Sequence, residues 1–147
     1  MTAPKIVGPG EGSDIKPFGI AMNVMLRAED TGGSFASLVA TLDPGQGPPP
    51  HFHHDHDEYF YILEGTFALS VAGRNVTAGP GTMVYVPRET VHAFTNIATT
   101  PGKILEWGLP GGQERYFEAI DQLGAKGQLN PESVVATSKA FETEFVI

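Results

Sequence analysis

Residues 51–58 concentrate side chains that bind metal ions. Four of the chain's five histidines and three carboxylates lie within these eight positions. His51 and His53 are two residues apart, so both imidazoles leave the same face of an extended segment. Glu58 opens the aromatic and β-branched run at residues 59–63, which is typical of a strand. Two imidazoles and a carboxylate on neighbouring strands can converge on one divalent ion.

The composition of the chain indicates one domain made of short strands. Its 147 residues suffice to bury one hydrophobic core. The 18 glycines and 12 prolines are scattered along the chain, which favours short strands joined by tight turns. A formal net charge of −8 argues against a nucleic-acid partner, which requires a basic face. With no cysteine, the chain has no disulfide, thiolate metal ligand or cysteine nucleophile.

Apolar runs long enough for targeting or for membrane insertion are not found in the sequence. The N-terminus has no apolar core of signal-peptide length, and no later run approaches a membrane span. We therefore expect a soluble, cytoplasmic protein with no membrane partner.

Residues 15–108 contain strand-sized runs separated by glycine or proline turns, with little helical periodicity. The clearest run, residues 34–42, alternates between two faces. Further strands are expected at residues 18–26, 59–63, 67–71, 76–77, 83–86, 92–97 and 103–107. This pattern favours a β-sandwich or barrel, preceded by an N-terminal arm at residues 1–14.

Residues 109–147 have a different pattern, which predicts a helical extension. Four side chains recur at helical spacing within residues 113–123: Tyr116, Phe117, Ile120 and Leu123. Asn130 is a helix cap followed by proline, which predicts a second helix from Pro131 to about Phe141. We expect these helices to cover one side or edge of the barrel, and their residues suggest no chemistry.

The spacing around the histidine cluster resembles the two sequence motifs of the cupin superfamily. The residues that match the first motif are Gly45, His51, His53, Glu58 and Gly65. After a spacer of fifteen residues, the matches to the second motif are Gly81, Pro87, His92 and Asn96. One position departs from the pattern, because Glu89 stands where the second motif usually has glycine. That position belongs to a turn and not to the ligand set.

The resemblance implies an all-β fold, the cupin double-stranded β-helix (jelly-roll) barrel with short C-terminal helices, as a single domain over residues 1–147. Carried over by position, the metal ligands are His51, His53, Glu58 and His92. They imply one divalent metal ion per chain, with zinc, iron, nickel and manganese as candidates. The resemblance also implies a homodimer that forms through the outer strands, to which residues 1–26 can contribute.

His56 is a second candidate for the third ligand. It lies two residues before Glu58, so a bulge in the chain would let it replace that carboxylate or join it. His54 has the opposite parity to the ligand histidines, and we expect it to face solvent. Asp55 and Asp57 are expected to be solvated loop acids, one of which can orient a ligand imidazole.

Apolar side chains of the barrel are expected to line a substrate pocket beside the metal. The candidates are Phe35, Phe60, Ile62, Met83 and Phe94, with Val39 and Tyr85 as alternatives to Phe35 and Met83. Such a lining favours an apolar, ring-containing substrate. No basic residue except Arg88 lies near the metal positions, which counts against a small anionic substrate held by a basic clamp.

Within the superfamily, the chain resembles small single-domain proteins similar to quercetin dioxygenases, a group that also includes metal-dependent polyketide cyclases. Three prolines before His51 and the run after Glu58 carry this resemblance, together with residues 109–117. It implies a dioxygenase acting on an aromatic or polyketide-like enol or phenol. In such an enzyme Glu58, or a bound hydroxide, removes a proton from the substrate.

Two alternatives remain open from the sequence. The first is a polyketide cyclase or isomerase that uses the metal as a Lewis acid without oxygen. The second is a non-enzymatic cupin that binds a small molecule.

Overall fold

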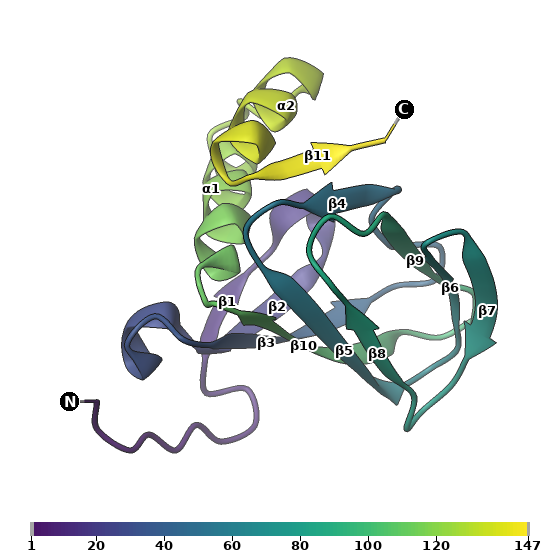
Figure 1. Ribbon diagram of the computed structural model, residues 1–147, viewed down its shortest axis with the longest axis horizontal. Helices are drawn as coiled ribbons and strands as arrows, with labels where there is room; N and C mark the ends of the chain where they lie inside the picture. Colours follow the sequence, from purple (N-terminus) through teal and green to yellow (C-terminus); the bar gives the residue numbers. More distant parts are fainter. Residues whose placement is uncertain (1, 147) are drawn as a thin grey trace.

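Two antiparallel sheets pack face to face in the computed structural model, which describes residues 2–146 (Figure 1). The strands are β1 (Ser13–Ile15), β2 (Ala21–Leu26), β3 (Ala36–Leu42), β4 (His51–His53), β5 (Asp57–Glu64), β6 (Phe67–Val71), β7 (Arg74–Ala78), β8 (Met83–Val86), β9 (His92–Asn96), β10 (Gly102–Leu109) and β11 (Thr143–Phe145). The helices are α1 (Gln113–Ala125) and α2 (Pro131–Ala140), and short 3-10 turns occur at η1 (Pro17–Gly19) and η2 (Ala28–Thr31).

The strand order confirms the expected jelly-roll barrel. One sheet has the order β1-β2-β3-β10-β5-β8, and the other has the order β11-β4-β9-β6-β7. Strands that follow each other in the chain therefore often lie in different sheets, as β4 and β5 do. Such crossovers wrap the chain around one interior, to which each strand turns every second residue.

Burial alternates along the central strands because one face of each sheet is inside the barrel. On β5 the inward residues are Glu58, Phe60 and Ile62, all at most 4% exposed. Their neighbours along the strand are partly buried or exposed. The same alternation on β10 turns Ile104 and Glu106 inward. Two of these inward positions carry carboxylates, which is unusual for an apolar core.

Helices α1 and α2 stand at one end of the barrel, beside β11 (Figure 1). Helix α1 buries Tyr116, Phe117 and Ile120, which confirms the helical spacing read from the sequence. The predicted cap of α2 is also present, because the Asn130 side chain accepts a hydrogen bond from the Ser133 amide at 2.9 Å. No helix within residues 2–146 is long and apolar enough to cross a membrane.

The two ends of the chain contain strands that the sequence pattern did not predict. Strand β1 lies partly within the expected arm and pairs with β2. The first long strand begins at Ala21 and not at Phe18, because Phe18 has a φ of 55° inside η1. Strand β11 lies within the expected helical extension and pairs with β4. Each missed strand has three residues, which is too short to display a period of two.

Candidate metal centre

Four buried side chains from three strands meet inside the barrel. His51 and His53 come from β4, His92 comes from β9, and Glu58 comes from β5 in the opposite sheet. One ligand atom from each of them lies within 4.8 Å of the others. We call these residues the His/Glu cluster.

The strand arrangement corrects one expectation about this cluster. His92 lies beside the first two histidines, because it pairs directly with His51. Glu58, expected on a strand next to β4, faces the histidines from the other sheet. The chain between β4 and β5 crosses from one sheet to the other, which the spacing of the ligands alone does not reveal.

Backbone carbonyls fix the orientation of two imidazoles. Nδ1 of His51 lies 2.8 Å from the Pro49 carbonyl oxygen, and Nδ1 of His92 lies 2.9 Å from that of Thr90. A carbonyl can only accept, so each Nδ1 carries the proton. In the neutral ring Nε2 then presents its lone pair toward the cluster.

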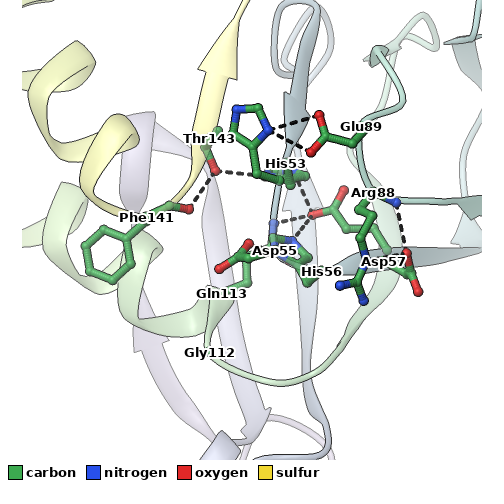
Figure 2. A network of polar contacts seen from close by, with 12 residues as sticks. His53, Asp55, His56, Asp57, Arg88, Glu89, Gly112, Gln113, Phe141 and Thr143 are labelled. Atoms are coloured by element: carbon green, nitrogen blue, oxygen red, sulfur yellow. Dashed lines mark hydrogen bonds and ion pairs between the residues drawn. The ribbon is translucent and has the colours of Figure 1, made fainter.

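A side-chain hydroxyl fixes the third imidazole. Nδ1 of His53 lies 2.8 Å from Oγ1 of Thr143, on the C-terminal strand. The same hydroxyl donates to the Phe141 carbonyl at 3.2 Å, so its oxygen is left to accept the proton of Nδ1 (Figure 2). His53 therefore also turns an unprotonated Nε2 inward.

The inward atoms of the cluster match the donor set of a cation. Nε2 of His53 lies 3.1 Å from Oε1 of Glu58, and Nε2 of His92 lies 2.8 Å from Oε2. Lone pairs that face a carboxylate at these distances repel one another unless a proton or a cation lies between them. Among the described residues, Nε2 of His53 is a buried polar atom without a hydrogen-bond partner. Three imidazoles and one carboxylate in this arrangement can hold a divalent metal ion.

The electrostatics keep the ligands in their metal-binding forms. Burial alone would raise the pKa of the Glu58 carboxyl, but where a proton occupies the space between the rings and the carboxylate, the charge and hydrogen bond of His53, with hydrogen bonds from His56 and His92, lower it well below the usual range. Burial, reinforced by the charge of His92, lowers the pKa of His51 to about 4. At neutral pH the carboxyl is therefore ionised and His51 is neutral.

His56 lies outside the His/Glu cluster. Its ring is buried, with Nε2 at 3.5 Å from Oε1 of Glu58 and Nδ1 at 2.8 Å from Asp55. Burial would lower its pKa, but the hydrogen bond and charge of Glu58 outweigh burial and raise it. No bulge brings His56 into the place of Glu58, because β5 pairs regularly from Asp57 to Ile62 and keeps Glu58 inward. Asp55 does orient an imidazole, that of His56, and Asp57 binds Arg88.

The parity of His54 predicted a side chain that faces solvent, but the structure shows one that is partly buried and bound to two carboxylates. The side chain is 34% exposed, and its two ring nitrogens contact two carboxylates, Glu89 at 2.8 Å and Glu144 at 2.6 Å. Glu89 has a φ of 67°, a left-handed conformation that explains why the motif usually has glycine here.

A cavity of about 530 Å³ adjoins the His/Glu cluster. His51, His53 and Glu58 form part of its wall. Most of the remaining wall is apolar and includes residues from η1, the barrel and both helices: Phe18, Ile20, Met22, Ala40, Leu42, Pro48, Pro49, Phe60, Phe94, Phe117, Val134, Val135 and Phe145. The cavity is thus an apolar chamber with its ionisable groups gathered at one place.

The predicted pocket residues are only partly correct. Phe60 and Phe94 line the cavity, whereas Ile62 is buried in the core outside its wall. Met83 is 55% exposed on the outer face of the sheet, and Phe35 lies just before β3 with outward parity. Alternation along a strand defines two faces but does not say which one is inward, so both of these predictions were wrong.

The sequence did not identify three residues that the structure places at the site. Glu106 lines the cavity from β10, Gln113 at the start of α1 donates a hydrogen bond to Oε1 of Glu58, and Thr143 orients His53. Burial and the charge of Glu58 raise the pKa of Glu106 well above the usual range. The sequence could have identified Glu106, because it is an acidic residue two positions after Ile104 and therefore on the same face of the strand. No local pattern identifies Gln113 or Thr143.

The jelly-roll barrel and its inward group of three imidazoles and one carboxylate define the class: a small β-barrel protein with a candidate metal centre. The family described as a cupin domain matches residues 38–108. An uncharacterised protein of Methanocaldococcus jannaschii is 30% identical over 112 residues, which cover 73% of this chain and 90% of that protein. The chain belongs to the cupin superfamily.

Further similarities connect the chain to enzymes. It is 26% identical over 117 residues to quercetin 2,3-dioxygenase of Bacillus subtilis, which covers 80% of this chain and 34% of the dioxygenase. The chain thus spans about a third of the length of that relative. The polyketide cyclase RemF from Streptomyces resistomycificus shares the fold, with a TM-score of 0.62 and 22% identity over 73% of this chain and 80% of the cyclase.

Proposed function

We propose that the protein is a metal-dependent cupin enzyme acting on an aromatic or polyketide-like molecule through an enol or phenol oxygen, as a quercetinase-like dioxygenase. The observation that carries this proposal is the continuity of the buried His/Glu cluster with a cavity of about 530 Å³ whose wall is mostly apolar. A cavity of this size suits a molecule of two or three rings. The similarity to the Bacillus subtilis dioxygenase supports the same substrate class.

The residues of the cluster have distinct roles in this proposal. Nε2 of the three histidines and the carboxylate of Glu58 hold one divalent ion, which supplies Lewis acidity toward a bound enol or phenol oxygen. The ionised Glu58 accepts the substrate hydroxyl proton on a carboxylate oxygen. The amide of Gln113 holds Oε1 of Glu58 in place for this transfer. The apolar wall excludes water from the anion that forms.

A cyclase or isomerase is the second candidate, and one observation favours it. Glu106 places a second buried carboxyl group next to Glu58 in the cavity. Two neighbouring carboxyl groups whose pKa values are pushed in opposite directions suit proton donation and removal without oxygen.

Metal analysis combined with oxygen uptake tests the proposal. Purified protein is expected to contain about one divalent ion per chain and to consume oxygen when quercetin is supplied. Glu58→Gln is expected to lower turnover by about 100-fold or more, because it removes an anionic ligand and the proton acceptor. Glu64→Gln, an exposed change on the same strand, is the matched control and should leave turnover unchanged.

The outcomes separate the candidates. Metal-loaded protein that converts a polyketide-like substrate without consuming oxygen would reject the dioxygenase in favour of the cyclase. Binding of quercetin with no conversion under either condition would favour a non-enzymatic role. Full metal content and turnover in Glu58→Gln would remove Glu58 from the ligand set.

A further inference from the structure

Glu106 carries a buried carboxyl group that lines the cavity but does not belong to the His/Glu cluster. It is 5% exposed and lies on β10 opposite Phe60 of β5. Two residues further along β10, Gly108 pairs with Glu58. Glu106 is therefore a diagonal neighbour of Glu58 on the inner face of one sheet, and both side chains line the cavity.

The strands on either side of Glu106 offer no structural reason for a carboxyl group. Its inward neighbours on the adjacent strands are Phe60 and Leu38, which are both buried and apolar. A buried polar group costs free energy unless it is hydrogen-bonded, so an aliphatic side chain would suit this position better for stability.

The polar groups within hydrogen-bonding reach of Glu106 are Gln113 and Glu58, and both also belong to the surroundings of the cluster. Gln113 donates its side-chain amide hydrogen to Oε1 of Glu58. Glu58 in turn lies against His53 and His92 at 3.1 and 2.8 Å. A carboxyl group has more hydrogen-bonding sites than these two contacts use, so Glu106 retains hydrogen-bonding capacity toward the cavity that it lines.

We propose that Glu106 binds the substrate by a hydrogen bond to a second oxygen, next to the oxygen that faces the His/Glu cluster. This inference rests on the proposed function and narrows its substrate class to aromatic or enolic molecules that carry two neighbouring oxygen functions. Diagonal neighbours on adjacent strands lie roughly 7–8 Å apart, and their carboxyl groups can converge on one molecule, so the two oxygens belong to the same ring or to adjacent ring positions. A carboxyl group in either protonation state can make this bond, by accepting from a hydroxyl or donating to a carbonyl.

Small two-ring phenols test this role by calorimetry on zinc-loaded protein under anaerobic conditions. The probes are 1-naphthol, with one oxygen, and the 1,2-, 1,3- and 1,8-dihydroxynaphthalenes, with two. At least one dihydroxynaphthalene should bind the wild-type protein about tenfold or more tightly than 1-naphthol does. Glu106→Leu should abolish this advantage and leave the affinity for 1-naphthol unchanged. Glu106→Gln should retain most of the advantage, because the amide still offers a hydrogen bond.

Met22→Leu is the matched control, because Met22 lines the same cavity with an apolar side chain. It should change the affinities for all four probes by a common factor. Zinc content and melting temperature are measured for every variant, so that a folding defect or loss of zinc is seen separately from loss of probe binding.

Three results would overturn the inference. An equal loss of 1-naphthol and dihydroxynaphthalene binding in Glu106→Leu would show that Glu106 only shapes the cavity and makes no hydrogen bond to the second oxygen. Loss of zinc from Glu106→Gln and Glu106→Leu would show that Glu106 acts through Glu58. Failure of wild-type protein to bind any of the four probes would instead reject the aromatic substrate class of the proposed function, and the inference with it.

Discussion

Three imidazoles of the His/Glu cluster present the same nitrogen because each Nδ1 has its own acceptor. For His51 and His92 the acceptor is a backbone carbonyl, which any residue at that position supplies. For His53 the acceptor is the hydroxyl of Thr143, which is 3% exposed. Thr143 is thus the one acceptor among these three whose residue type matters.

Thr143→Val tests this contact with little change in side-chain shape. The valine cannot accept the Nδ1 proton of His53, so zinc affinity is expected to fall by about tenfold or more. Thr143→Ser, which keeps the hydroxyl, should restore most of the affinity. Competition with a zinc-binding dye measures both variants. Equal losses in the two variants, or no loss in Thr143→Val, would mean that Thr143 only fills space.

At the scale of elements, strand β4 is held in place by segments far away in the chain. It has only three residues, and its pairing with β9 is short. The His53 carbonyl accepts a hydrogen bond from the Glu89 amide at 2.7 Å, and the His54 amide donates to the Glu142 carbonyl at 2.8 Å. The side chain of His54 adds its two carboxylate contacts. Two of the metal-ligand candidates therefore depend on the position of the C-terminal segment.

The contacts of His54 predict a pH dependence of stability. Hydrogen bonds that His54 donates to Glu89 and then Glu144 raise its pKa above the ordinary value of 6.5. The folded state therefore holds this proton more tightly than the unfolded state does. The resulting stabilisation is complete below pH 6.5 and is lost as the pH rises through the raised pKa of the folded state.

Melting temperatures of chelator-treated wild-type protein and His54→Gln measure this effect between pH 5.5 and about 9. The difference in melting temperature is expected to be largest at the acidic end and to shrink toward the alkaline end. Glu144→Gln should reproduce part of the difference with the same pH profile. A difference that stays constant across the range would attribute the contribution of His54 to packing rather than charge.

At the scale of the whole molecule, the outer face of the six-stranded sheet is rich in aromatic side chains. The ring of Tyr59 stacks on Tyr85 and Trp107, with centroids 5.0 and 5.3 Å apart. Tyr85 and Met83 remain 53% and 55% exposed. Exposed apolar patches of this kind are typical of interaction surfaces, and we predict that this face forms the homodimer expected from the resemblance to cupins.

The homodimer stays a prediction, and light scattering during size-exclusion chromatography tests it. Wild-type protein is expected to elute with twice the mass of one chain. Met83→Glu should shift it to the monomer, because a charge would be buried at the interface. Val76→Glu, at an exposed position on β7 of the other sheet, should leave the dimer intact. A monomeric wild-type protein, or equal effects of both variants, would contradict the assignment of this face.

The sequence alone determined the local features of the protein. The spacing of His51, His53, Glu58 and His92 identified the residues that meet in the barrel. Alternation placed Phe60 on the face of Glu58, and the Asn130 cap located the start of α2. These features depend on the geometry of single strands and helix ends, which neighbouring residues specify.

Only the tertiary structure decided how distant segments meet. It placed Glu58 in the sheet opposite the histidines, turned Met83 outward, and kept His56 outside the His/Glu cluster. It also brought Glu106 and Thr143 to the site from outside both cupin motifs. Which strands pair, and which face of each becomes the interior, depends on burial and hydrogen bonding summed over the whole barrel. No local pattern carries that information, because a strand's alternation is the same whichever face is buried.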